Sequence, residues 1–191
     1  MTNPEVFDGI YSESMWGYKS GPGSDPEFAS FWIDTVNSFL AKPEIVSVID
    51  VGCGDWRIGK HLNLDGKDYT GVDISSVILE ETRLNTSDNI KFVQGDFELL
   101  EIHDADLIII KDVLQHLTNK SVYNIVNKIM KKSKYALFCD DMLDKNNNDI
   151  YAGEFRFLDL SAEPFNFKFK RLGDFGGKVI SLYTRDEEAN A

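Results

Sequence analysis

The sequence predicts an α/β domain in which a doubly wound, mostly parallel sheet of seven strands ends in an antiparallel hairpin. Apolar segments of strand length alternate with helix-like segments from residue 45 to residue 140, and such alternation is typical of a parallel sheet with helices on both faces. The segment DLIIIK at 106–111 is apolar nearly throughout, as expected for a strand that is covered on both sides. Near the C-terminus, FNFKFKRL and KVISLYTR flank the glycine-containing segment GDFGG, which indicates the closing hairpin.

Local signals place the individual elements. Asp25 is a suitable helix N-cap residue and Pro26 a suitable first helical residue, so a helix should begin there. Ser75 or Ser76 should cap a second long helix, and Thr118 a third. In chain order, the expected elements are a helix at 25–41, a strand at 45–51, a short helix at 56–63, strands at 68–73 and 90–94 with a helix to residue 84 between them, a strand at 106–111, a helix to residue 132, a strand at 134–139, and the hairpin.

The charge balance and the cysteine count narrow the possible partners and location. The chain has 20 basic and 32 acidic residues and a formal net charge of −12, which argues against nucleic acid as the main partner. Two cysteines, Cys53 and Cys139, do not make a disulfide framework, so a reducing compartment fits best. The N-terminus lacks a signal-peptide pattern, and the longest strongly apolar run is too short to span a bilayer. We therefore expect a cytoplasmic protein without a membrane partner.

An apolar strand ends in a glycine turn within VIDVGCGDW, residues 48–56. In doubly wound sheets, ligands bind where the first strand turns into the first helix. Gly52 and Gly54 permit unusual backbone conformations and close approach of a ligand. Asp50 lies just before them, Asp73 ends the second strand, and Asp96 follows the third. Each acid alone suits a turn or a cap, but the three on consecutive strands favour a nucleoside-shaped ligand.

The positions of these acids suit the two polar parts of a nucleoside. Asp73 is placed to accept hydrogen bonds from both ribose hydroxyls, and Asp96 from an adenine amine, with Phe97 beside the ring. A dinucleotide fingerprint needs a third glycine where this chain has Arg57, and no GxxxxGK[ST] phosphate loop is present. The turn therefore favours a nucleoside ligand that has no pyrophosphate.

With these motifs in order, the chain resembles class I S-adenosylmethionine (SAM)-dependent methyltransferases, whose fold is Rossmann-like. VIDVGCGDW looks like their first motif, YTGVDIS like their second-strand acid, FVQGDF like their adenine motif, and DLIIIKDVLQHL like their fourth strand and its helix. The resemblance covers roughly residues 45–140 and implies SAM as cofactor. It implies that the cofactor contacts the residues Asp50, Gly52, Cys53, Gly54, Asp73, Ile74, Asp96, Phe97, Lys111, Trp16 and Ser20. Asp55-Trp56 depart from the family pattern, in which many members have a small residue and then glycine.

A narrower resemblance covers most of the chain. YSESMWGYKSGPGS, GCGDW, KDVLQHL and NNNDIYAGEFRFLDLSAEPFNF look like short methyltransferase-like chains of bacteria and large viruses, some of them associated with sugar or glycan methylation. By this resemblance, residues 1–41 form a lid and helix, 45–140 the cofactor-binding core, and 141–191 an acceptor-side loop with the hairpin. The lid would close on the cofactor with Trp16 and Tyr18, although SGPGS also suits an ordinary linker.

The end of the fourth strand faces the cofactor's methyl group in this fold, and Lys111, Asp112 and His116 lie there. A hydroxyl acceptor must lose its proton, and a histidine with an ordinary pKa near ~6.5 suits that task. His116 is therefore a candidate general base, or else a buried histidine that bonds to the backbone. Asp112 would orient His116, act as the base itself, or cap a helix.

A metal mechanism is the alternative to a histidine base. Asp140 and Asp141 follow the fifth strand, and with Asp112 or His116 they would offer oxygen ligands for Mg²⁺. We favour the reading in which no metal is bound and these acids avoid the core.

The acceptor should be a small polar molecule such as a sugar or glycan, bound near residues 146–149 and Arg156. Phe155, Phe157, Phe165, Phe167 and Phe169 alternate in the sequence and are expected to be strand core. Two other functions are open: a nicotinamide-dependent reductase on a similar fold, and a non-catalytic module that binds the cofactor or a partner. The oligomeric state is not predicted.

Overall fold

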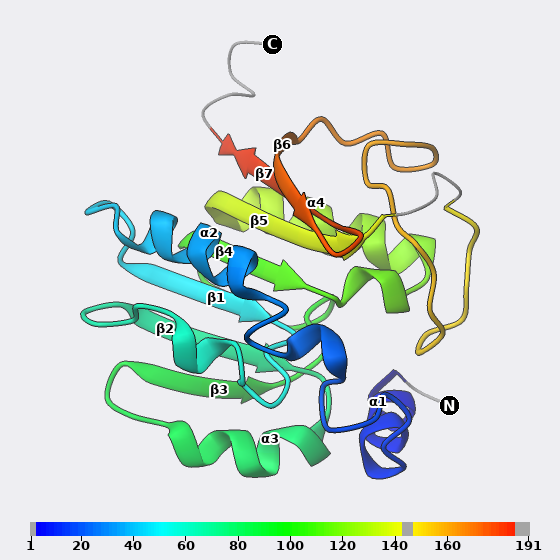
Figure 1. Cartoon of the computed structure of the whole chain (residues 1–191), viewed down its shortest axis with the longest axis horizontal. Helices are drawn as coiled ribbons and strands as arrows, with labels where there is room; N and C mark the ends of the chain where they lie inside the picture. The colour runs from blue at the N-terminus through cyan, green and yellow to red at the C-terminus, as the bar shows by residue number, and fades with distance from the viewer. Residues whose placement is uncertain (1–2, 143–146, 186–191) are drawn as a thin grey trace.

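The computed structural model describes residues 3–142 and 147–185, and it contains the predicted seven-stranded sheet (Figure 1). The strands run in the order β3-β2-β1-β4-β5-β7-β6. The first five are parallel, whereas β7 is antiparallel to both β5 and β6. Their bounds are β1 Ser47–Val51, β2 Asp68–Asp73, β3 Ile90–Gln94, β4 Ala105–Lys111, β5 Ser133–Asp141, β6 Lys170–Phe175 and β7 Lys178–Thr184. The predicted fold class is confirmed.

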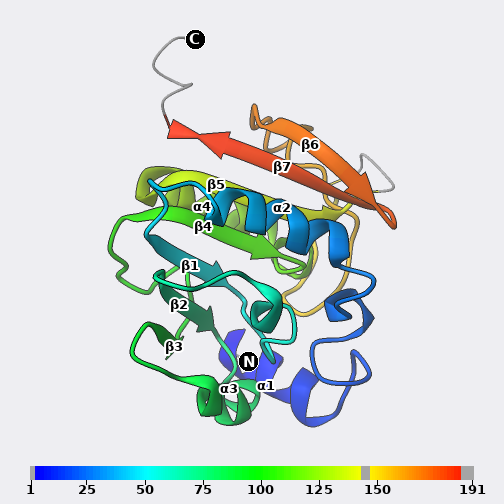
Figure 2. The same ribbon diagram turned by 60° about the vertical axis from the view of Figure 1, so that its left-hand side comes forward.

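Helices cover both faces of the sheet, with α2 (Ser30–Leu40) on one face and α4 (Asn119–Lys132) on the other (Figures 1 and 2). Strand β4 shows why its sequence is apolar throughout. Leu107 and Ile109 are buried against the α2 side, while Ile108 and Ile110 are buried in the cluster that contains α4. Each face therefore has its own apolar core, and side chains of the central strands alternate between the two.

The strand order reverses direction at β1, which pairs with β2 on one side and β4 on the other. Val51, the last residue of β1, lies opposite Val72 of β2 and Ile110 of β4. At such a reversal the connections leave on opposite faces, and a crevice opens at the carboxyl ends of the strands. In Figure 1 this edge faces α1 (Asn3–Ser12) and the N-terminal end of α3 (Ser76–Thr82).

Two of the predicted caps are present. Ser75 accepts a hydrogen bond from the Ile78 N–H at the start of α3, and Thr118 does the same for Ser121 at the start of α4. Asp25 accepts from two N–H groups, but these belong to a turn that precedes α2, so the helix begins at Ser30 rather than at Asp25.

The structure differs from the sequence predictions in three further places. Helix α1 was not predicted, because the only helix expected within residues 1–41 was the one at 25–41. The helix expected at 56–63 is only the 3₁₀ turn Gly59–His61, since Gly59 would lie inside the expected helix, where glycine is unfavourable. Strand β6 begins at Lys170, so the alternating phenylalanines precede it. Three of them stack on one another instead, Phe165, Phe167 and Phe169.

Among the helices of residues 3–142 and 147–185, none is both long and apolar enough to cross a bilayer.

Candidate functional site

A cavity of about 550 Å³ opens at the carboxyl ends of β1, β2 and β4. This is the edge at which the sequence placed the ligand. Most of the predicted site residues line it: Gly52, Cys53, Gly54, Asp73, Ile74, Asp96, Phe97, Lys111, Asp112, His116, Asp141, Trp16 and Ser20. The fold therefore brings together, in one hollow, residues that lie more than a hundred positions apart in the sequence.

Two of the residues predicted to contact the cofactor or a metal ion do not line this cavity. Asp50 accepts a hydrogen bond from the Tyr69 hydroxyl at 2.6 Å, and burial raises the pKa of its carboxyl to about 6. Asp140 lines a separate, smaller cavity beside Phe167 and Phe169. Alternation along a strand explains the second case, because neighbours in β5 point to opposite faces and Asp141 takes the cavity side.

The glycine turn after β1 is shaped by positive φ angles and close contacts. Gly52 has φ +72° and Gly54 has φ +54°, which is the left-handed region that favours glycine. A β-carbon on Gly52 would lie 2.2 Å from Val113, and one on Gly54 would lie 2.3 Å from the Ser20 hydroxyl. Neither position has room for a side chain, so both glycines are needed for the turn to pass under the cavity.

Asp73 is the buried acid at the end of β2. One carboxylate oxygen accepts from the Gly54 N–H at 2.9 Å and the other from the Ser75 N–H at 3.0 Å. Burial raises the pKa of Asp73 to about 6, against the opposing effect of these backbone hydrogen bonds. The carboxylate thus ties the glycine turn to the start of α3 while it lines the cavity.

Further along the same edge, Asp96 and Phe97 follow β3. Phe97 is buried, and its carbonyl accepts a hydrogen bond from the Lys128 ammonium at 2.6 Å. Asp96 is half-buried and accepts from the Glu98 N–H at 2.9 Å. An acid and an aromatic ring therefore stand beside the end of the cavity that lies nearest β3.

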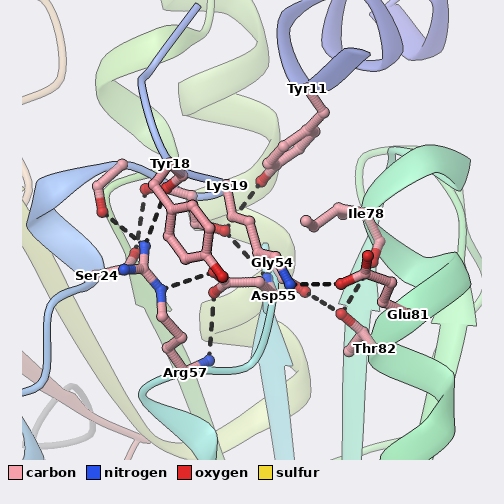
Figure 3. A network of polar contacts seen from close by, with 12 residues as sticks. Tyr11, Tyr18, Lys19, Ser24, Gly54, Asp55, Arg57, Ile78, Glu81 and Thr82 are labelled. Carbon is pink, nitrogen blue, oxygen red and sulfur yellow. Dashed lines mark hydrogen bonds and ion pairs between the residues drawn. The ribbon is translucent and has the colours of Figure 1, made fainter. Parts of the chain in front are cut away.

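The segment 13–24 passes over the glycine turn, and Figure 3 shows the polar contacts that hold it there. The Ser20 hydroxyl accepts from the Asp55 N–H at 3.0 Å. Trp16 lines the cavity, where its ring centroid lies 4.8 Å from that of His116. Tyr18, in contrast, is 71% exposed and does not line the cavity, so only Trp16 of the two expected lid aromatics reaches it.

Arg57 is a residue whose part in this arrangement the sequence did not suggest. Its guanidinium donates to the Gly21 carbonyl at 2.8 Å and the Tyr18 carbonyl at 3.3 Å, and it pairs with Asp55 at 2.7 Å (Figure 3). The sequence showed Arg57 only as the residue that replaces a third glycine. Its side chain fastens segment 13–24 to the turn after β1.

Replacing Arg57 with alanine should loosen segment 13–24. Two carbonyl groups lose their donor, so we expect trypsin to cleave after Lys19 several-fold faster, with thermal unfolding of the core changed by no more than about 1–2 kcal/mol. The measurement is timed proteolysis followed by mass spectrometry. Arg83→Ala is the control, because this exposed arginine lies in the 3₁₀ turn Arg83–Asn85, outside segment 13–24, and its removal should leave the cleavage rate nearly unchanged. Equal rates in Arg57→Ala and the parent would contradict the assignment.

At the end of β4, Asp112 adopts φ +57°, an uncommon conformation for a residue with a side chain. Both of its carboxylate oxygens are paired, one with the Lys178 ammonium at 2.6 Å and the other with Lys111. Lys111 also donates to the Gly23 carbonyl of segment 13–24 at 2.7 Å. Burial alone would raise the pKa of Asp112, but the two ammonium groups lower it overall. Asp112 is therefore a weak candidate for the base.

His116 has a defined tautomer. Its Nδ1 lies 2.9 Å from the Glu154 carbonyl oxygen, which can only accept, so we assign the proton to Nδ1 and the lone pair to Nε2. Burial lowers the pKa of His116 below its ordinary 6.5, although the Glu154 carbonyl and Asp112 act in the opposite direction. At neutral pH the imidazole is uncharged, as a proton acceptor must be.

The predicted acceptor loop contributes less than expected to this cavity. Asn146 lies outside the described residues. Arg156 is buried and donates to the Leu117 carbonyl at 2.8 Å, so it joins the loop to the segment before α4 and does not line the cavity. Phe155 does line it, next to His116. Within 3–142 and 147–185, no group of three or more histidine, cysteine, aspartate or glutamate side chains is arranged to hold a metal ion.

The fold and the cavity place the chain among doubly wound α/β domains with a ligand cavity at the strand reversal. A family model described as "Methyltransferase domain" matches residues 44–162. The chain therefore belongs to this methyltransferase domain family.

Three solved structures with a similar fold are methyltransferases of low sequence identity to this chain. Human N-acetylserotonin methyltransferase, solved with SAM, is 16% identical with a TM-score of 0.67; the match covers 97% of this chain and 60% of that chain. The N-methyltransferase NodS from Bradyrhizobium japonicum WM9, solved with S-adenosyl-L-homocysteine, is 13% identical with a TM-score of 0.68, covering 93% and 98%. Magnesium protoporphyrin IX methyltransferase from Synechocystis PCC 6803 is 15% identical with a TM-score of 0.64, covering 95% and 97%. A comparison with curated protein sequences found no match.

Proposed function

We propose that this chain is a SAM-dependent methyltransferase that acts on a hydroxyl group of a small polar acceptor such as a sugar. The observation that carries the proposal is that the glycine turn, Asp73 and Asp96, which follow or end the neighbouring strands β1, β2 and β3, all line one cavity. Family membership supports the reaction type. The neighbours act on chemically different acceptors, so the sugar is proposed from the sequence resemblance to chains associated with sugar methylation, and the hydroxyl from the neutral imidazole of His116 that lines the cavity.

The residues present fit the cofactor. The positive φ angles of Gly52 and Gly54 place the backbone of the turn in the cavity wall, where a β-carbon at either position would collide with Val113 or Ser20. Asp73 and Asp96 supply carboxylate acceptors for ribose hydroxyls and for the adenine amine, and Phe97 supplies an apolar wall. The position of Trp16 over the cavity suits a lid that shields the reacting atoms from water. Cys53 lines the cavity as an inert thiol, because burial raises its pKa well above the usual range.

The bound cofactor supplies an activated methyl group on a sulfonium. The protein then has to hold the acceptor in line with it and receive one proton. His116 Nε2 is the group that we propose for that proton, while Nδ1–H stays bonded to the Glu154 carbonyl. We also propose that the protein works in a reducing compartment such as the cytoplasm, since both cysteines are free thiols in the structure.

S-adenosylhomocysteine should bind the purified protein and raise its melting temperature. Ligand at a hundred times its dissociation constant should add about 2.7 kcal/mol to the free energy of unfolding. The measurements are thermal unfolding and calorimetric titration, with NAD as the comparison ligand. Stabilisation by NAD alone would favour the reductase, and the absence of any response to millimolar S-adenosylhomocysteine would refute the cofactor assignment.

The acceptor class needs a separate experiment. Purified protein with methyl-labelled cofactor should transfer label to members of a panel of sugars, nucleotide sugars and glycans. Tight cofactor binding with no transfer to any acceptor would instead favour a non-catalytic binding module.

A further inference from the structure

Four charged side chains close the end of the cavity next to His116. The Lys178 ammonium lies 2.6 Å from an oxygen of Asp112 and 2.6 Å from an oxygen of Asp141. Lys111 pairs with the other oxygen of Asp112. The cluster holds two positive and two negative charges, and it joins β4, β5 and β7. Lys178 had no part in the functions considered from the sequence.

The four charges are not equally accessible. The Lys111 and Lys178 side chains are 7% and 5% exposed, whereas those of Asp112 and Asp141 are 17% and 20% exposed. The ammonium groups therefore lie behind the carboxylates. A ligand that enters this end of the cavity meets acidic oxygens, even though the cluster as a whole is neutral.

The surrounding structure fixes Lys178 and Asp141 in place. The two residues lie directly opposite each other in the β5–β7 pairing. Gln115 accepts from the Asp141 N–H at 2.8 Å and donates to the Asp141 carboxylate at 3.0 Å, so the acid is held at both its backbone and its side chain. Among the described residues, the remaining Asp141 oxygen, Oδ1, has no hydrogen-bond partner, which leaves it for a ligand.

We propose that the Lys178 ammonium is a built-in cation of the acceptor site. It lies between the carboxylates of Asp112 and Asp141, where a divalent metal ion would otherwise lie, and keeps the two acids close together. The exposed oxygens of the two acids then bind hydrogen-bond donors of the acceptor. The proposal about the acceptor rests on the proposed function, whereas the role of Lys178 does not. Mg²⁺ is commonly held by one or two carboxylates with water in its remaining positions. An ammonium with three N–H groups satisfies the same carboxylates with no bound ion.

The charge state of Lys178 agrees with this role. Burial by itself would lower the pKa of Lys178, but Asp112 and Asp141 raise it above its ordinary value. The lysine is thus a permanent cation, and its shielding makes it a positioning residue rather than one that touches the acceptor. Donor-bearing acceptors such as polyols suit the two exposed carboxylates, while a carboxylate or phosphate at this end would face two anions.

Lys178→Ala tests the proposal without any acceptor. The variant leaves two carboxylates facing each other with no bridging ammonium, so it should acquire a divalent-ion site. We expect it to melt at a lower temperature than the parent, and millimolar Mg²⁺ or Mn²⁺ to restore several degrees, while the parent responds little at matched ionic strength. Lys67→Ala is the matched control, because Lys67 is a partly buried lysine that donates only to the Ile45 carbonyl, away from the cavity.

The double variant Lys178→Ala/Asp141→Asn identifies the ligands. Removing one carboxylate charge should abolish the metal response and recover part of the lost melting temperature. If Lys178→Ala does not fold, Lys178→Gln takes its place with the same readouts. A Mg²⁺ response in the single variant that is no larger than that of the parent and of Lys67→Ala would overturn the proposal. Because the readout is ion binding, that failure would leave the cofactor assignment, tested with S-adenosylhomocysteine, unaffected.

Discussion

Replacing His116 with alanine is expected to slow methyl transfer to a hydroxyl acceptor by about 10²–10⁴-fold, with cofactor affinity nearly intact. The reason is the tautomer: Nδ1–H is bonded to the Glu154 carbonyl, so Nε2 carries the lone pair of a histidine that lines the cavity. Turnover with the acceptor found by labelled screening, and titration with S-adenosylhomocysteine, measure the two effects separately. His103→Ala is the control, because that histidine is exposed and does not line the cavity.

The pH dependence of the parent gives a second measure of the same role. Only the neutral imidazole accepts a proton, so turnover should rise with pH through the pKa of His116. Burial lowers that pKa below 6.5, hence the rate should already be level at neutral pH. Near-parental turnover in His116→Ala would show that His116 is a packing residue and not the base. Loss of parental activity on chelation would point to a metal mechanism instead.

Asp73→Asn is expected to weaken binding of S-adenosylhomocysteine by roughly 10²-fold or more, because two charge-assisted hydrogen bonds to the ribose are lost. The structure adds a cost to folding. The carboxylate accepts from two backbone N–H groups, and an asparagine can accept only one of them, so the free energy of unfolding should fall by about 1–3 kcal/mol. Calorimetric titration and thermal unfolding measure the two quantities.

A neighbouring acid provides the control for Asp73. Asp50→Asn removes a carboxyl whose pKa is also about 6, but which bonds to Tyr69 and does not line the cavity. Cofactor affinity in this variant should stay near the parental value. In both the parent and Asp50→Asn, affinity should fall as the pH drops through about 6, where Asp73 gains a proton and loses its charge. Parental affinity in Asp73→Asn would show that the ribose assignment is wrong.

The sheet was predictable because its signals are local. Strand β4 is covered on both faces, and its sequence is apolar at nearly every position. Ser75 and Thr118 cap α3 and α4 by accepting hydrogen bonds from backbone N–H groups only three residues away. The phenylalanines before β6 gave a wrong prediction, because their local pattern is compatible with more than one structure. Alternation is also compatible with rings stacked along an irregular segment, and only the contacts made by Phe167 distinguish the two.

The cavity was predictable in part. Strand ends meet at one edge of a parallel sheet, so acids and glycines placed there by the sequence come together in the structure. Which side of a strand each acid takes depends on its exact register, and that is why Asp141 lines the cavity while Asp140 does not. The contacts made by Arg57 and Lys178 join segments far apart in the chain. Such contacts cannot be predicted from residue spacing, because they form only when the N-terminal segment and the hairpin pack against the rest of the domain.

The hydrogen bond from Lys111 to the Gly23 carbonyl connects two parts of the site that have so far been treated separately. Gly23 belongs to the segment that covers the cavity, and Lys111 belongs to the charge cluster at the acceptor end. If that segment moves away, the Lys111 ammonium loses the Gly23 carbonyl as a hydrogen-bond partner and keeps only its contact with Asp112 among the described residues. Opening of segment 13–24 would therefore be felt at the charge cluster, because it removes one of the two polar partners of Lys111. A change at the cluster, such as loss of Lys178, should in turn alter how tightly the segment is held over the cavity.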